Sequence, residues 1–231
     1  MNILSILENR SCYLCGSPDD GRSGLCFECQ DHIKHSSLKK GTLCPRCSQP
    51  LLSNDPQFCP FCHSVPGVEQ LHSISYFNSY MKELLTLFKS GKMPCLRFFF
   101  ASLIYEYLKK EGLLDAVLVP VPPRRGKFRD QGWDQVDLLC KTLKRSYRIR
   151  IERILERTDR IQQKTLSFEE REQHMKKILR YKDSTVKLEG FRAVILFDDI
   201  FTSGATISAA AELLGKKYTG ELSALVLCSV I

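Results

Sequence analysis

The chain of 231 residues carries a formal net charge of +8 and is 43% hydrophobic, which suits one ordinary domain with a buried core plus a smaller one. Its opening residues lack the basic start, apolar stretch and small-residue cleavage site of a signal peptide. No stretch reaches the roughly 20 apolar residues of a membrane-spanning helix, so we expect a soluble cytoplasmic protein without a transmembrane segment.

Cysteine pairs dominate the first part of the sequence. Eight of the eleven cysteines lie within the first 62 residues, as four C-x2-C pairs. Two thiolates at this spacing can bind one tetrahedral ion from a single tight turn, and two such turns complete a four-cysteine zinc site. The expected ligands of one or two structural zinc ions are Cys12, Cys15, Cys26, Cys29, Cys44, Cys47, Cys59 and Cys62.

The spacing alone leaves the pairing of the four turns open. The loops between successive pairs hold ten, 14 and 11 residues, and each shorter loop suits a hairpin that brings its two turns together. We therefore prefer sequential pairing with two zinc ions, and an interleaved arrangement is the alternative. Disulfides are disfavoured because no secretion signal accompanies the cysteines. The single cysteines Cys95, Cys140 and Cys228 lie among apolar residues, so we expect them to be buried thiols.

The rest of the chain has the pattern of an α/β domain. Residues 1–65 cannot form a core by packing alone, so we expect a double zinc ribbon over 1–65 and a second domain over 66–231. Strands that alternate with helices in the second domain indicate a parallel sheet. The expected strands are 72–77, 116–119, 192–197 and 221–231, and the expected helices are 80–90, 95–110, 132–145 and 205–217. Residues 149–182 have a mixed pattern that predicts no element.

An anion site is predicted after the strand at 192–197. Asp198 and Asp199 follow four apolar residues, and a hydroxyl-rich loop with one glycine leads into a helix. Backbone N–H groups at a helix N-terminus and nearby hydroxyls favour a phosphate, while two carboxylates can accept hydrogen bonds from a sugar diol. The expected phosphate contacts are Thr202, Ser203, Gly204, Ala205 and Thr206. The alternative is an ordinary helix start capped by Thr202 or Ser203.

This string resembles the motif by which type I phosphoribosyltransferases bind 5-phosphoribosyl-1-pyrophosphate (PRPP), and the likeness extends to the ComF family. Members carry a Val-Pro-Val-Pro segment, which is residues 119–122 in this chain. An Arg-Gly-Phe-Asn-Gln segment follows in the family, and residues 129–135 match it only in part, with Arg125-Gly126 nearby. A family pattern containing Gln-x-x-Leu-Ser-x-x-x-Arg is similar to residues 163–171, although His174 stands where members usually have Asn. A doubled zinc ribbon at the N-terminus completes the resemblance.

The resemblance implies a type I phosphoribosyltransferase-like fold and a role for each matching residue. Asp198 and Asp199 would bind the ribose hydroxyls, and loop 202–206 would bind the 5-phosphate of PRPP or a related phosphorylated sugar. Mg²⁺ would accompany PRPP. Residues placed like the family's pyrophosphate loop are Lys89 and Gly91, and those in the region that would cover the site are Arg157, Gln163 and Arg171.

A basic stretch over 124–182 holds 18 Lys/Arg against nine Asp/Glu. Cations interleaved with aromatic rings suit single-stranded nucleic acid, because cations follow the phosphates and rings stack on bases. The alternatives are solvated helix faces and recruitment of some arginines by PRPP itself. The candidate nucleic-acid contacts are Arg145, Arg148, Arg150 and Trp133.

Three functions are compatible with these sequence patterns. The first, favoured by the resemblance, is a competence protein for natural transformation that binds PRPP and handles single-stranded DNA. It would work with DNA-uptake or recombination proteins near the inner face of the cell membrane. The second is a phosphoribosyltransferase with an unknown acceptor base, although no residue pattern identifies a catalytic acid or base. The third is a zinc-dependent adaptor with a vestigial nucleotide fold.

Overall fold

The computed structural model of the chain describes most of residues 66–231 and much of residues 1–65. For residues 168–169 and 171–172 it describes the backbone alone. The described residues are 11–19, 22–38, 43–51, 59, 65–90, 93–123, 126–127, 132–158, 168–182, 186 and 188–230.

A five-stranded parallel sheet forms the centre of the molecule, with the strand order β1-β7-β6-β2-β3. Its strands are β1 (Leu71–Tyr76), β7 (Glu221–Ser229), β6 (Ala193–Phe201), β2 (Val117–Pro120) and β3 (Arg150–Ile151). Most residues of β1, β2, β6 and β7 are buried, as expected for a sheet covered on both faces. The predicted α/β fold with a parallel sheet is therefore confirmed.

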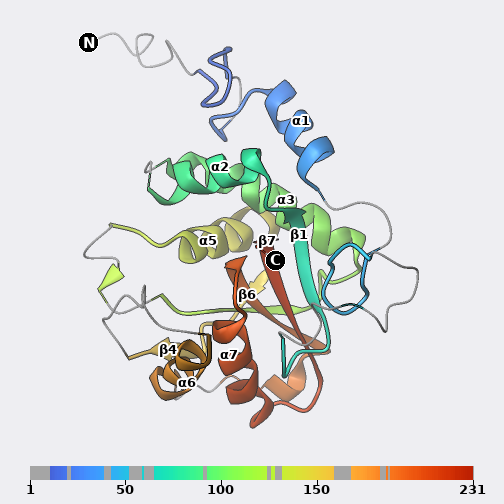
Figure 1. Cartoon of the computed structure of the whole chain (residues 1–231), viewed down its shortest axis with the longest axis vertical. Helices are drawn as coiled ribbons and strands as arrows, with labels where there is room; N and C mark the ends of the chain where they lie inside the picture. The colour runs from blue at the N-terminus through green and yellow to red at the C-terminus, as the bar shows by residue number, and fades with distance from the viewer. Residues whose placement is uncertain are drawn as a thin grey trace.

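Helices cover both faces of the sheet (Figure 1). One face carries α2 (Ser79–Lys89), α3 (Arg97–Lys110), which follows a 3₁₀ turn at Pro94–Leu96, and α5 (Gln135–Tyr147). The other face carries α6 (Phe168–Ile178) and α7 (Ala205–Gly215). A second 3₁₀ turn, Leu188–Gly190, precedes β6. No described helix has the length and apolar character needed to cross a membrane.

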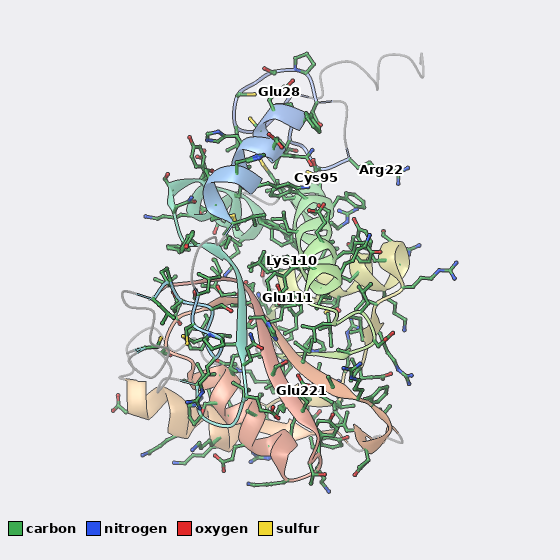
Figure 2. All side chains as sticks on the ribbon, turned by 90° about the vertical axis from the view of Figure 1, so that its right-hand side faces the viewer. Arg22, Glu28, Cys95, Lys110, Glu111 and Glu221 are labelled. Carbon is green, nitrogen blue, oxygen red and sulfur yellow. The ribbon has the colours of Figure 1, made fainter. Side chains whose placement is uncertain are left out.

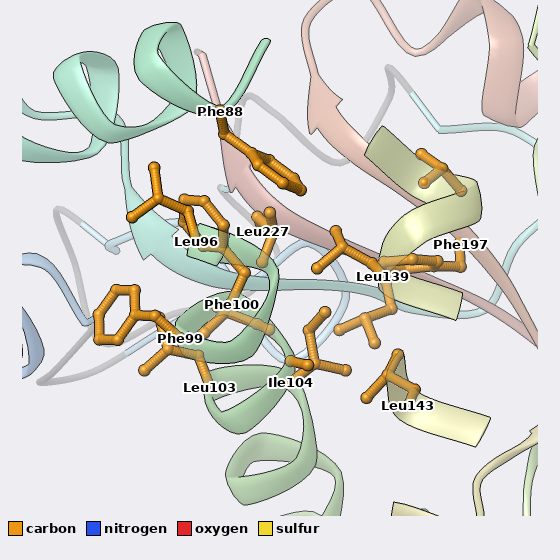
Figure 3. Packing of buried hydrophobic residues seen from close by; sticks show 14 of the residues in the cluster. Phe88, Leu96, Phe99, Phe100, Leu103, Ile104, Leu139, Leu143, Phe197 and Leu227 are labelled. Atoms are coloured by element: carbon orange, nitrogen blue, oxygen red, sulfur yellow. The ribbon is translucent and has the colours of Figure 1, made fainter. Parts of the chain in front are cut away.

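Alternating side chains of β6 divide the core in two. Ile195 and Phe197 point toward the layer of α2, α3 and α5, whereas Val194 and Leu196 join the core under α7, following the period of two of a β-strand. Figure 3 shows Phe88 and Phe100, from two helices, packed in the same cluster as Phe197. The sheet is therefore fixed from both sides, so the loops at its carboxyl edge start from rigid strands.

The stretch at 149–182, which had no predicted element, folds into short pieces. After the edge strand β3 come β4 (Leu155–Arg157) and β5 (Leu179–Tyr181), which pair with each other in an antiparallel ribbon. Helix α6 lies between them in sequence and contacts α7, where Lys176 pairs with Glu212 at 2.9 Å. Strands of two or three residues are too short to leave an apolar periodicity that could be found in the sequence.

The N-terminal part adds a helix that the sequence did not predict. Helix α1 (Phe27–Ser37) begins directly after Cys26 and lies against α2 (Figure 1). Lys34 pairs with Glu106 of α3 at 2.9 Å, and His32 packs edge-on against Tyr80. The boundary at residue 65 stays a prediction, since cysteines from this part share buried clusters with helices and strands of the second domain.

A second N-terminal segment, 43–51, is joined to the sheet through buried polar contacts. The backbone N–H of Leu71, at the start of β1, donates to the carbonyl of Arg46 at 2.6 Å. The buried Gln49 side chain donates through Nε2 to Ser229 Oγ at the end of β7, and Ser229 in turn contacts Ser73 Oγ at 2.9 Å. This segment therefore reaches the carboxyl edge of the sheet.

Candidate functional site

The two predicted carboxylates lie where β6 runs beyond its neighbour β2. The expected strand end at residue 197 was wrong, because β6 continues to Phe201 by pairing with β7 as far as Ser229. On the other side, β2 stops at Pro120, which is the partner of Phe197. Asp198 and Asp199 therefore lie on a strand paired along only one edge, at the carboxyl edge of the sheet.

This position is a topological switch point of the fold. From β2 the chain passes through α5 to β3 on one side, and from β6 it passes through α7 to β7 on the other side. Because α5 and α7 cover opposite faces, the loops after β2 and β6 diverge. Ligands of open α/β sheets bind in the crevice that such divergent loops create.

The two carboxylates have different electrostatic surroundings. Asp199 forms an ion pair with Lys89, the last residue of α2, with 2.7 Å between Asp199 Oδ2 and Lys89 Nζ. Burial, followed by the neighbouring Asp199 charge, raises the pKa of Asp198 to about 7, although a backbone hydrogen bond and Lys89 oppose the shift. Burial tends to lower the pKa of Lys89, but its contact with Asp199 outweighs burial and the net shift is upward. The site therefore holds one ionised pair and one carboxyl group that can gain or lose a proton near neutral pH.

The start of α7 is open to an anion. Gly204 is the N-cap residue, has a φ of +76° and makes no side-chain cap hydrogen bond. A residue with a side chain is strained at this φ, which explains the glycine. The alternative helix start capped by Thr202 or Ser203 was therefore wrong. Thr202 is exposed and Ser203 half-buried, and the N–H groups of the first turn have no side-chain acceptor from the cap position.

The expected covering residues are only partly within the described chain. Arg157 lies on β4 and lines a cavity together with Pro120, so it reaches the same edge of the sheet as the carboxylates. Arg171 belongs to α6, but its side chain is not described, and Gly91 and Gln163 lie outside the described residues.

A buried polar cluster beside the carboxylates was missed as a site by the sequence interpretation. Lys127 Nζ contacts Asp134 Oδ2 and lies 2.7 Å from Gln135 Oε1. Asp134 also caps α5 by accepting from the backbone N–H of Asp137 at 2.8 Å. The sequence does contain a signal for this cluster, because the carboxylate of Asp134 and the amide of Gln135 come directly before an apolar helix pattern. These two residues were related only to a family segment, and no polar cluster was predicted from them.

The cysteines gather into two separate clusters, in the sequential arrangement. The sulfurs within each cluster lie within 4.8 Å of one another, and the clusters are Cys12, Cys15, Cys26 and Cys29, and Cys44, Cys47 and Cys59. Among the described residues, no cluster mixes the first and third pairs, so the interleaved alternative is not observed. Cys62, the expected fourth member of the second cluster, lies outside the described residues.

The first pair of each cluster sits in the same kind of turn. Cys12 N–H donates to Ser17 O at 2.7 Å, and Cys44 N–H donates to Gln49 O at 2.8 Å. The residue four positions after the first cysteine has a positive φ in both turns, 74° at Gly16 and 54° at Ser48. The third pair therefore repeats the geometry of the first, whereas the second pair lies at the N-terminus of α1 rather than in a matching turn.

The chemistry of both clusters fits a structural zinc ion. Cys15 Sγ lies 3.6 Å from Cys26 Sγ, and Cys47 Sγ lies 3.4 Å from Cys59 Sγ. Burial, and then the neighbouring sulfurs, raise the pKa of Cys29, while burial is the main cause of the raised pKa of Cys47. Hydrogen bonds with Ser17, by contrast, lower the pKa of Cys15 to about 6. A cation bound between the sulfurs favours the thiolate form of all of them. Both clusters could therefore hold zinc.

The three single cysteines do not behave alike. Cys140 and Cys228 are fully buried, as predicted. Cys95 is only half-buried, so that part of the prediction was wrong. Its thiol donates to the Tyr13 hydroxyl at 3.5 Å, and it lies just beneath the α1 region at one end of the molecule (Figure 2). The contact joins the first cysteine turn to the start of α3.

The candidate nucleic-acid contacts fall at two places. Arg145 and Arg148 lie at the end of α5, and Arg150 opens β3, where it stacks over Phe191 with 4.3 Å between guanidinium carbon and ring centre. Trp133 precedes α5 and packs against Phe88 with 5.1 Å between ring centres. A helix of 13 residues is about 20 Å long, so the structure does not bring Trp133 next to the arginines.

The chain is similar in sequence to several known proteins. The chain is 28% identical over 194 residues to competence protein ComFC of Streptococcus pneumoniae, covering 83% of this chain and 81% of that protein. It is 26% identical to competence protein F of Haemophilus influenzae (93% and 94% covered) and 24% identical to the DNA utilization protein YhgH of Escherichia coli (95% and 97% covered). The chain matches no family model.

The fold and site define a class: a parallel α/β protein with two carboxylates and an uncapped helix start at a switch point, and with cysteine clusters suited to zinc in its N-terminal part. Relatives that match most of the chain carry competence names. These matches, which cover most of the chain, support membership of the ComF family.

Proposed function

We propose that the chain binds PRPP, accompanied by Mg²⁺, at the carboxyl edge of β6, and that it acts in the handling of incoming DNA. The observation that carries the first part is the arrangement of Asp198, Asp199 and Lys89 directly before the uncapped start of α7. Carboxylate acceptors for a sugar diol, an anion-binding helix start and a lysine for the pyrophosphate thus occur within one site.

Each part of PRPP has a matching group in this proposal. The 5-phosphate binds the N–H groups of the first turn of α7 and the hydroxyls of Thr202, Ser203 and Thr206. The ribose hydroxyls bind the carboxylates, and Lys89 contacts the pyrophosphate. Mg²⁺ prefers oxygen ligands and usually combines carboxylates with substrate phosphates, so it would bridge the pyrophosphate near Asp198.

A calorimetric titration with PRPP and Mg²⁺ tests this binding site. The double variant Asp198→Asn with Asp199→Asn is expected to abolish binding while the fold is retained, because the acceptors are weakened and side-chain volume barely changes. Unaltered affinity would show that the two carboxylates serve the scaffold. Measuring pyrophosphate release with a panel of bases then distinguishes a phosphoribosyltransferase from a protein that uses PRPP as ligand or regulator.

A role in competence is supported by the names of the relatives, which include two competence proteins and a DNA utilization protein. The basic residues Arg145, Arg148 and Arg150 supply a surface for single-stranded DNA in this proposal. They lie at the amino edge of the sheet, because Arg150 pairs with Val117 at the start of β2. Asp198 is four residues farther along β6 than the partner of Val117, about 13 Å in strand length. DNA and PRPP would therefore bind at opposite edges.

A further inference from the structure

A cavity of about 340 Å³ lies next to the carboxylate loop and has no role in the function proposed above. Its walls come from the prolines that follow β2, the first turn of α5, Arg153, β4 and Lys182. Cavities that hold small molecules usually range from about 300 to 1,000 Å³. This cavity is therefore at the lower end of that range and suits a single-ring compound better than an oligonucleotide.

The cavity adjoins the proposed PRPP site through the end of β2. Pro120 is the partner of Phe197, and Val121 N–H donates to Phe197 O at 2.9 Å. Asp198 follows Phe197 directly, so the residues that line the cavity are neighbours of the residue before the first carboxylate. A molecule in this cavity would lie at the switch point of the sheet, beside the sugar of a bound PRPP.

One part of the cavity wall is apolar and rigid. Val121, Val136 and Leu155 are all buried and line the cavity together with Pro122 and Pro123. Proline has no backbone N–H and a ring that fixes its conformation, so this wall offers few donors and little freedom. Such a surface packs favourably against the face of a ring.

Each acid of the cavity wall has a cation beside it, from the wall itself or from a neighbouring segment. Asp134 is paired with Lys127, and Asp137 is paired with both Lys141, at 2.7 Å, and Arg153, at 2.9 Å. In the ribbon, the exposed Glu156 is the cross-strand neighbour of Arg180, which has the opposite charge.

Besides Arg157, which also lines the cavity, Lys182 is a cation of that wall. Its side chain is half-buried and lines the cavity, and it makes no ion pair with any residue that the structure describes. A cation in a partly desolvated position without an acid is stabilised by an anionic ligand.

We propose that this cavity binds a small planar ring that carries one acidic group, with the ring on the apolar wall and the acidic group near Lys182. The role of this ligand rests on the proposed function, because the ligand would be a second reactant or co-ligand only if PRPP binds beside it. Binding of the acid itself can be measured with or without PRPP.

Matched pairs of probes test the assignment. Nicotinate and its neutral isostere nicotinamide, and orotate and uracil, differ mainly in the acidic group. We expect one of the acids to bind at least tenfold more tightly than its neutral counterpart, measured by calorimetry or by saturation-transfer NMR on the full chain with Mg²⁺ and PRPP. Val136→Trp, which fills the cavity, should remove binding of every probe.

A lysine pair provides the control for charge and for folding. Lys182→Met should abolish the preference for the acid, whereas Lys110→Met, at a different cavity of about 310 Å³, should retain it, with the fold of both variants checked by circular dichroism. Equal binding of acid and neutral probes, an unchanged preference in Lys182→Met, or no binding of any probe would overturn the assignment. Acid binding without any affinity for PRPP would support the cavity and contradict the proposed PRPP site.

Discussion

Lys89 Nζ lies 2.7 Å from Asp199 Oδ2, and this ion pair joins the end of α2 to the end of β6. Both side chains are partly shielded from water, with 34% and 15% of their surface exposed, so the pair is screened less than an exposed one. The contact places a cation beside two carboxylates, at the site that we propose for a sugar phosphate.

The first prediction concerns this lysine. Lys89→Met should lower PRPP affinity at least tenfold, because the variant loses the cation that contacts the pyrophosphate in the proposed site and leaves two carboxylates without that cation. Isothermal calorimetry with Mg²⁺ measures the change. Lys82→Met, on the same helix but exposed, is the matched control and should stay within twofold of the wild type. A Lys89→Met protein with wild-type affinity would remove this residue from the site.

The second prediction follows from the pKa of Asp198. Its ordinary value is 3.8, and burial beside Asp199 raises the pKa to about 7. Between these values the folded state binds more protons than the unfolded state, so this group makes the protein less stable as the pH rises from about 4 to 7. Asp198→Asn cannot ionise, so this decrease in the free energy of unfolding is absent from the variant.

The variant should therefore gain stability relative to the wild type across this pH range. We expect a gain of about 1–3 kcal/mol by pH 8, because one pKa unit corresponds to about 1.4 kcal/mol and partial solvent access reduces the full effect. Urea unfolding at pH 4.5 and pH 8 measures the difference. Parallel stability curves for the two proteins would mean that Asp198 is ionised throughout this range.

The sequence predicted the sheet and its helices well because each strong element has an apolar pattern that local physics explains. The helix predicted at 80–90 is α2 (Ser79–Lys89), and its buried residues are those with three- and four-residue spacing. The C-terminal limit of β6 was harder to predict from the sequence. Asp198 and Asp199 are polar, yet they belong to the strand because β7 continues beside them to Ser229, and a partner strand cannot be seen in the local sequence.

Parts of the site could not be predicted for a similar reason. Lys127 and Asp134 meet between β2 and α5, and the cavity beside them also takes its lining from β4 and Lys182, which are distant in sequence. Helix α1 was missed because its sequence is mostly polar and it lies close to cysteines that suggested turns. These features depend on tertiary contacts rather than on periodicity.

The third prediction concerns metal. The protein purified without chelators should contain two zinc equivalents, and Cys47→Ser should lose about one of them, as measured by elemental analysis. Cys95→Ser is the control, since Cys95 lies close to the first turn but belongs to neither sulfur cluster. It should retain both equivalents. A metal-free wild-type protein would contradict the prediction, and a single equivalent would mean that one cluster is empty.

The fourth prediction concerns DNA. If the arginines after α5 bind single strands, changing Arg145, Arg148 and Arg150 to alanine should weaken binding at least tenfold and leave PRPP affinity unchanged, because they lie at the far edge of the sheet from Asp198. Binding should also fall steeply with salt, with a logarithmic slope of roughly −0.7 for each phosphate contact. Fluorescence anisotropy with a labelled oligonucleotide measures both.

A second triple variant controls for net charge. Lys176, Lys216 and Lys217 belong to α6 and the end of α7, on the opposite face of the sheet, and their change to alanine should leave DNA affinity within about twofold. Equal losses in the two triple variants would indicate a general charge effect. The surface hypothesis is falsified if single strands at physiological salt bind no better than heparin fragments of the same size.

The hydrogen bond from Gln49 to Ser229 spans 180 residues of sequence, and this separation has a consequence for biosynthesis. At roughly 5–20 residues per second, the ribosome needs about 10–35 s to travel from one residue to the other. During that interval the buried amide of Gln49 lacks its partner, and β7 is not yet present to pair with β1. The turn that holds Cys44 and Cys47 therefore cannot complete its buried contacts until β7 has left the ribosome. Until then its thiols are accessible to oxidants. A nascent chain stalled before β7 should accordingly react with a thiol reagent at Cys44 and Cys47, whereas the released protein should be protected.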